Sequence, residues 1–200
     1  SHLIKISQNI KNLSNENASW RQYYSLERGD DFSSKGMLYT YTGAAFYDND
    51  DKFSKITFSD IEDNNFLKTT NESWISMIEH YFFTAWLPTT GTNEPQTIYT
   101  RFSRDGGIKQ YLIGSVGNYK VIAPNSIETF NSRLFVGPKN QSEIKELASG
   151  LDLTVDYGVL TFLAAPLFWV LDNIFYFLGN WGWSIIALTL LIKILFFRLS

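Results

Sequence analysis

The residue best placed to do chemistry in this sequence is a lysine embedded in an apolar segment. Lys193 lies within the run SIIALTLLIKILFF, which contains no other charged residue. A lysine at the centre of a membrane helix costs about 2.5–3.5 kcal/mol, so such a residue is functional by default and acts through its charge. The alternative is a lysine near a helix end whose ammonium group reaches back to the aqueous interface. The residue pattern alone leaves both interpretations open.

Two further groups of residues could support chemistry. Glu79 and His80 are adjacent and could exchange protons, and the turn that contains Asp48, Asp50 and Asp51 could bind calcium. No third catalytic group accompanies the first pair, and the aspartates lack the spacing and terminal glutamate of an EF-hand loop. We therefore expect the first pair to be structural or exposed and the aspartates to form a solvated turn, and we predict no catalytic residue, no metal site and no cofactor.

The composition excludes several functional classes. The 200 residues carry a formal net charge of −3 and include no cysteine. Disulfides, cysteine nucleophiles and thiolate metal sites are therefore excluded. The isoelectric point is near 5.4, whereas a nucleic-acid-binding domain normally has a basic patch and a high isoelectric point. We expect no nucleic-acid partner.

Apolar residues are concentrated in two blocks, at 159–178 and 181–199. About 20 helical residues are needed to cross the hydrocarbon core of a bilayer. The first block is interrupted by Pro166, Asp172 and Asn173, and its polar residues form a narrow stripe. This pattern predicts a helix that lies on the membrane surface and bends near the proline. The second block predicts a transmembrane helix.

Four residues of these blocks are expected at the membrane interface: Trp169, Asp172, Trp181 and Trp183. Tryptophan is enriched where lipid headgroups meet the hydrocarbon core. No lysine or arginine occurs between Lys145 and Lys193. The positive-inside rule therefore places the C-terminal end of the second block in the cytoplasm and the preceding domain outside.

The first 147 residues predict a β-sandwich, because short runs of β-forming residues alternate with turn residues. The runs expected to form strands are 37–42, 53–58, 97–102, 108–113, 119–122 and 133–136. The turn Asp105-Gly106-Gly107 between two of these runs predicts a β-hairpin.

One segment, 73–88, departs from the strand pattern. Its apolar residues follow helical spacing, with Ser73 as a candidate N-cap and Pro88 as a stop, which predicts a short helix that passes into a strand. Further along, 142–148 predicts a short helix, and 151–158 predicts a linker. The predicted organisation is a β-domain at 1–147, a linker and surface helix at 148–179, and a transmembrane helix at 180–200.

Several motifs, taken together, resemble the YidC membrane insertases of Gram-negative bacteria. The match is close at the junction between the β-domain and the apolar blocks, with LDLTVDYG at 151–158, PLF at 166–168 and GNWGWSII at 179–186. Motifs similar to those of the family's periplasmic domain are YTGAAF at 41–46, TAWLP at 84–88 and LFVGP at 134–138. Each motif alone is weak, but their common order and spacing are specific.

The resemblance implies a mainly β fold, with a β-supersandwich periplasmic domain followed by an amphipathic surface helix and a transmembrane α-helix. In this family the transmembrane helix carries a basic residue that faces a water-filled groove. By position that residue is Lys193, a lysine where many relatives have arginine. The resemblance covers only part of the family's length, so this segment is not expected to insert proteins by itself.

The resemblance also implies a function and partners. The whole protein would insert inner-membrane proteins and help them to fold, alone or with the Sec translocon, as a multi-pass protein of the bacterial inner membrane. Its partners would be the lipid bilayer and nascent membrane proteins. The alternative is a membrane-anchored periplasmic β-domain that binds carbohydrate or docks partner proteins. Exposed aromatic residues beside paired carboxylates would favour carbohydrate binding.

Overall fold

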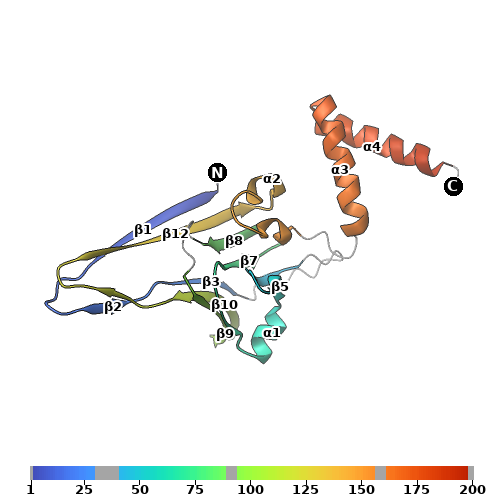
Figure 1. Cartoon of the computed structure of the whole chain (residues 1–200). Helices are drawn as coiled ribbons and strands as arrows, with labels where there is room; N and C mark the ends of the chain where they lie inside the picture. Colours follow the sequence, from blue (N-terminus) through green and yellow to red (C-terminus); the bar gives the residue numbers. More distant parts are fainter. Residues whose placement is uncertain (1, 30–40, 89–93, 156–160, 198–200) are drawn as a thin grey trace. The chain divides into compact units, whose positions relative to one another are not determined.

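The computed structural model describes residues 2–29, 41–88, 94–155 and 161–197. By its contacts the chain forms two compact units, Ser1–Val155 and Asp156–Ser200 (Figure 1). The first unit is built mainly from β-strands and the second from two helices. The predicted mainly β fold with helices near the C-terminal end is confirmed.

The first unit contains antiparallel sheets of six, four and two strands within the described residues. Their strand orders are β1-β12-β8-β7-β4-β5, β3-β10-β9-β6 and β11-β2. The six-stranded sheet consists of β1 (Leu3–Lys11), β12 (Ile127–Pro138), β8 (Phe82–Leu87), β7 (Trp74–Ile78), β4 (Gly43–Asp48) and β5 (Lys52–Ile56). The others consist of β3 (Tyr23–Gly29), β10 (Ile108–Gly117), β9 (Gln96–Asp105), β6 (Leu67–Thr70), β11 (Lys120–Ile122) and β2 (Ala18–Trp20).

Most of the predicted strands are confirmed. Strands β5, β9, β10, β11 and β12 overlap five of the six predicted runs. In the predicted hairpin, Asp105 pairs with Ile108, and Gly106 and Gly107 have φ values of 56° and 89°. This left-handed backbone favours glycine, which explains the turn sequence. Most of the sixth run, at 37–42, lies outside the described residues.

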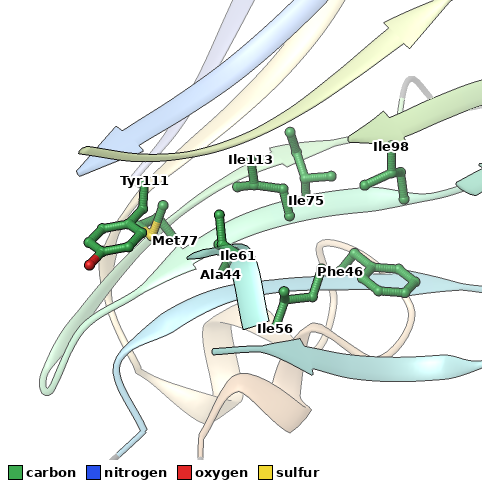
Figure 2. Close-up of a cluster of buried hydrophobic side chains, with 9 residues drawn as sticks. All are labelled: Ala44, Phe46, Ile56, Ile61, Ile75, Met77, Ile98, Tyr111 and Ile113. Atoms are coloured by element: carbon green, nitrogen blue, oxygen red, sulfur yellow. The ribbon is translucent and has the colours of Figure 1, made fainter. Parts of the chain in front are cut away.

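The core between the two larger sheets is apolar. It includes buried side chains from β4, β5 and β7 on one side and from β9 and β10 on the other, together with Ile61 of α1 (Phe58–Asp63). Figure 2 shows these nine residues: Ala44, Phe46, Ile56, Ile61, Ile75, Met77, Ile98, Tyr111 and Ile113. Their removal from water is the main favourable contribution to the packing of the two sheets.

The segment that follows β12 covers the opposite face of the six-stranded sheet. Ile144 of α2 (Gln141–Ile144) and Leu151 of the 3₁₀ helix η1 (Leu151–Thr154) are buried against Trp74 and its neighbours. The indole Nε1 of Trp74 donates a hydrogen bond to the carbonyl oxygen of Ser149 over 2.9 Å. Gly150 has a φ of 71°, and a Cβ atom there would lie 2.3 Å from the Tyr47 ring. Glycine is therefore required where this segment crosses the sheet.

This covering segment differs from the predicted linker at 151–158. Leu151 and Thr154 are buried, and the first unit extends to Val155 and so beyond the predicted boundary at 147. The predicted helix at 142–148 is shorter than expected, because α2 ends at Ile144. The apolar residues of this segment thus belong to the core of the first unit.

The helix predicted within 73–88 is wrong. This segment forms two antiparallel strands, β7 and β8, and Ser73 caps no helix. All five residues of β7 are buried, since the strand lies between β4 and β8 and both faces of the sheet are covered. A strand buried on both faces loses the alternation of apolar and polar residues that identifies most strands. Among the aromatic side chains of this segment, Trp74 and Phe83 are buried in the core, whereas Tyr81 and Phe82 are exposed.

The aspartate turn after β4 connects the two large sheets through an ion cluster. Lys68 of β6 pairs with the fully buried Asp48, and its Nζ lies 2.6 Å from Asp51 Oδ2. Asp48 Oδ1 also accepts hydrogen bonds from the backbone N–H groups of Asp50 and Asp51 over 2.9 and 2.7 Å. The lysine thus lies where a bound calcium ion would need the same carboxylates, and the expected solvated turn is wrong for Asp48, because this carboxylate is buried in the ion cluster.

We predict that Asp48→Asn lowers the free energy of unfolding by about 2 kcal/mol at neutral pH, because Lys68 loses a buried partner. Burial alone would raise the pKa of Asp48, but hydrogen bonds from Lys68 and from the Asp51 and Asp50 backbone outweigh it and lower the pKa. The wild-type protein is therefore more stable than the variant above a pH of about 3.9, which is the pKa of aspartate in the unfolded chain. This difference is lost as the pH falls through the lower pKa that Asp48 has in the folded protein. Urea denaturation at neutral and strongly acidic pH measures both effects.

The matched control is Asp50→Asn, which changes a neighbouring aspartate whose side chain is exposed. It should leave the stability nearly unchanged at both pH values. Equal losses in the two variants would contradict the role of the buried ion cluster.

Candidate functional site

The second unit exposes large apolar and aromatic side chains along a helix, α3 (Thr161–Leu178). The exposed fraction is 67% for Trp169 and 85% for Tyr176, and Phe177 is exposed to a similar degree. A helix is confirmed for the first apolar block, and Pro166 lies inside it, while its place on the membrane surface stays a prediction. Contiguous exposed apolar surface of this kind marks a site of membrane or protein contact.

A tight turn joins α3 to α4 (Trp181–Phe196). Gly179 has a φ of 63°, and its N–H donates to the carbonyl oxygen of Phe175 over 2.8 Å, which ends α3. Asn180 is the N-cap of α4, and its Oδ1 accepts hydrogen bonds from the N–H groups of Gly182 and Trp183 over 2.8 and 3.3 Å. These bonds satisfy donors that the first turn of a helix leaves free.

Aromatic stacking adds a second contact across the same turn. The rings of Phe175 and Trp181 are stacked with centroids 4.1 Å apart. Ser184 is buried nearby, and its hydroxyl donates to the carbonyl oxygen of Asn180 over 2.8 Å. The helix cap and the stacked rings therefore both restrain the joint between α3 and α4.

Lys193 lies in the last turn of α4 and is exposed. Its neighbours Ile194 and Leu195 are also strongly exposed. Among the described residues, no carboxylate forms an ion pair with Lys193. The structure thus places an ammonium group among exposed apolar side chains.

The helix that carries Lys193 is shorter than the predicted transmembrane segment at 181–199. α4 has 16 residues, which corresponds to about 24 Å of helix. Within the part of the chain that the structure describes, no helix combines the length and apolarity needed to cross a membrane.

The four predicted interface residues fall on the two helices of the second unit. Trp169 and Asp172 are exposed on α3, and Trp181 and Trp183 are exposed in the first turn of α4. The structure brings only Trp181 of these four into a ring contact among the described residues, through its stacking on Phe175. Within the same residues Asp172 and Lys193 do not form an ion pair.

Sequence reasoning missed the residues that shape the joint. Asn180 was not identified as a cap, although an asparagine directly before an apolar helix is a recognised N-cap signal. Phe175 was treated only as part of an apolar block, and its contact with Trp181 depends on the turn geometry, which has no separate sequence signal.

The candidate acid–base pair lies in the first unit and has a structural role. Glu79 Oε1 lies 3.4 Å from Nη1 of Arg28, whose side chain is largely buried. The two residues line a cleft of about 680 Å³ together with apolar residues such as Leu26 and Phe83. Among the described residues, no group of three or more histidine, cysteine or acidic side chains could hold a metal ion.

We predict that Asn180→Ala weakens the start of α4, because the N–H groups of Gly182 and Trp183 lose their acceptor. Loss of an N-cap costs about 1 kcal/mol, so hydrogen exchange at these two amides should accelerate by roughly fivefold. Exchange measured by NMR on the chain in lipid bicelles tests this expectation. Asn180→Asp keeps a side-chain oxygen acceptor, now a carboxylate, and should retain slow exchange, whereas fast exchange in this variant as well would contradict the cap.

The chain matches a known protein family over most of its length. A family model described as the YidC periplasmic domain matches residues 1–170. This match covers the whole first unit and reaches into α3.

Relatives from several bacteria resemble the chain over nearly all of its residues. The membrane protein insertase YidC of Thioalkalivibrio sulfidiphilus is 41% identical over 199 residues, which cover 99% of this chain and 35% of that protein. The membrane protein insertases YidC of Alkalilimnicola ehrlichii and Methylobacillus flagellatus are 39% and 42% identical over 202 residues, which cover all of this chain and 35% and 36% of those proteins. The chain thus spans about a third of the length of the curated relatives it matches.

Proposed function

We propose that this chain, which belongs to the YidC family, is the periplasmic and membrane-entry part of a membrane protein insertase. The observation that carries the proposal is the apolar surface that α3 and α4 leave exposed directly after a folded β unit. Each relative named above is called an insertase. No observation on the chain favours the carbohydrate-binding alternative.

In this proposal the second unit lies in the bacterial inner membrane. α3 rests at the periplasmic surface, with its aromatic side chains among the lipid headgroups and upper acyl chains. α4 enters the hydrocarbon core from Trp181 and directs its C-terminal end toward the cytoplasm, as the distribution of lysine and arginine requires. α4 ends at Phe196 and is about 24 Å long. The hydrocarbon core is about 30 Å thick, and the proposed span extends to residue 199.

Lys193 provides the chemistry of the proposed insertase through its charge. It lies 12 residues after Trp181, which places its Cα about 18 Å along α4 and past the bilayer midplane. An ammonium group at that depth must face water or a partner. A water-filled groove open to the cytoplasm meets this need, and it lets Lys193 attract acidic or polar parts of an incoming nascent chain. Attraction of this kind lowers the free energy needed to move such parts into the bilayer.

The remaining assignments follow from the same proposal. The protein acts without covalent catalysis or a cofactor, and as a whole it crosses the inner membrane several times. Its substrates are nascent membrane proteins, which it inserts alone or with components of the Sec translocon. The β unit stands in the periplasm, where its sheets provide surface for such partners.

We predict that Lys193→Ala impairs insertion in the full-length insertase that carries this segment, because the groove loses its cation. The loss should be greatest for substrates whose translocated segments are acidic. Lys193→Arg keeps the charge and should retain function. Protease protection of newly inserted substrates in inverted membrane vesicles measures the effect.

The control substrate for this experiment has a neutral translocated segment of the same length. Its insertion should depend much less on Lys193. If the Lys193→Ala variant inserts every substrate as well as the wild type, the proposed role is wrong. Lys193 would then be a lysine near a helix end whose ammonium group reaches the interface.

We also predict that α3 lies at the membrane interface. A fluorescent probe attached at position 169 of the chain in lipid bilayers should be quenched most strongly by nitroxides near the headgroups and weakly by nitroxides at the acyl-chain ends. The reason is that the exposed aromatic residues of α3 occur beside Asp172, a carboxylate that the hydrocarbon core would exclude. Strongest quenching at the midplane would contradict this placement.

A further inference from the structure

One face of α3 combines a carboxylate with two exposed aromatic rings. Trp169, Asp172 and Tyr176 are spaced by three and four residues, so they lie along the same side of the helix. All three side chains are exposed, the tryptophan by 67% and the tyrosine by 85%. We call these three residues the α3 stripe. Along the helix Asp172 comes between the two aromatic residues, and this combination suits an organic cation, because aromatic faces attract cations as carboxylates do.

The charged residues that precede and include Asp172 in this part of the sequence are all acidic. Residues 146–192 contain no lysine, arginine or histidine, and Asp172 is the only charged residue of α3. Among the described residues, no basic side chain pairs with Asp172. Helices that bind anionic membranes normally carry lysine or arginine on their polar face. The α3 stripe lacks such groups and would repel an anionic headgroup at short range.

From this stripe we propose a lipid preference that rests on the proposed membrane position of α3. The α3 stripe binds the ammonium group of a zwitterionic ethanolamine phospholipid. Asp172 accepts hydrogen bonds from the ammonium group, and the rings of Trp169 and Tyr176 flank it through cation–π contacts. The acyl chains of the same lipid lie against the apolar residues of the helix.

The chemistry of the headgroup distinguishes ethanolamine from two other common classes. A phosphoglycerol headgroup carries net negative charge and provides no cation for Asp172. A choline headgroup carries a cation and can contact the rings, but its methylated nitrogen has no N–H to donate to a carboxylate. The expected order of binding at the α3 stripe is therefore ethanolamine, then choline, then glycerol.

The test uses the full chain in bilayer nanodiscs that contain equal amounts of phosphatidylethanolamine, phosphatidylcholine and phosphatidylglycerol. Native mass spectrometry then counts the lipids that remain bound after the discs are dissociated. We expect phosphatidylethanolamine to exceed phosphatidylglycerol on the order of threefold, which matches the strength of a partly exposed cation–π and carboxylate contact. Asp172→Asn should abolish this enrichment, and Asp172→Lys should reverse it toward phosphatidylglycerol.

Two control variants distinguish an effect of the position of Asp172 in the α3 stripe from an effect of net charge. The double change Asp172→Asn with Asn173→Asp preserves the charge but moves the carboxylate by about 100° around the helix, so the enrichment should be lost. Asp152→Asn removes a carboxylate from the first unit and should leave the enrichment intact. Circular dichroism of each variant verifies that the helices are retained.

Three outcomes would overturn the lipid preference: no enrichment in the wild-type chain, enrichment of phosphatidylglycerol, or equal enrichment in the wild-type chain and Asp172→Asn. The probe at position 169 separates this failure from failure of the proposed function. If quenching still places α3 at the headgroups, only the lipid preference is wrong. If quenching places α3 at the midplane, the proposed membrane position is wrong as well.

Discussion

The burial of strand β7 on both faces is the constraint on which the first unit depends. One face packs against the four-stranded sheet and α1, and the other requires a cover that a two-sheet sandwich does not supply. The segment after β12 provides this cover through Leu151 and through the hydrogen bond from Trp74 to Ser149. The same segment ends the first unit before α3 begins. The packing of this segment in the core thus determines where the β unit ends, at Val155. A substitution that weakens this packing would also destabilise the end of the unit.

The second unit follows the opposite rule, since many of its large apolar side chains are exposed, while two of its hydroxyl groups are satisfied locally. Ser184 and Thr189 donate their hydroxyl hydrogens to carbonyl oxygens four residues earlier in the chain, over 2.8 and 2.7 Å. Hydroxyl groups bonded in this way can enter an apolar solvent at low cost. One chain thus contains a unit that buries its apolar surface within itself and a unit whose apolar surface suits lipid. The mean hydropathy of the whole chain, −0.12, averages these two opposite patterns and therefore reveals neither of them.

The sequence was sufficient for elements with a strong local signal and insufficient where tertiary contacts decide the structure. The glycines of the β9–β10 hairpin and the composition of α3 and α4 identify those elements without further context. The sequence predicts a strand only for the later part of 73–88, and β7 was missed because burial on both faces removes the alternation that reveals a strand. The covering role of Leu151 was missed because it depends on which face of the sheet lacks a partner. At the candidate site, the sequence identifies Trp169 and Lys193 as candidates whose roles stay predictions, whereas the stacking of Phe175 on Trp181 depends on the turn between the helices.

Asp172 and Lys193 are opposite charges within one helical unit, and their separation determines what each can do. An ion pair between them would neutralise both and leave an apolar hairpin suited only to anchoring. In the described residues they do not pair, so each requires water or an external partner to offset the cost of its charge near lipid. In the proposed lipid preference, Asp172 on α3 binds a headgroup cation. In the proposed function, Lys193 in the last turn of α4 attracts the acidic part of an incoming polypeptide. Both proposals use the same pair of helices, and the capped, stacked joint at Asn180 restrains those helices.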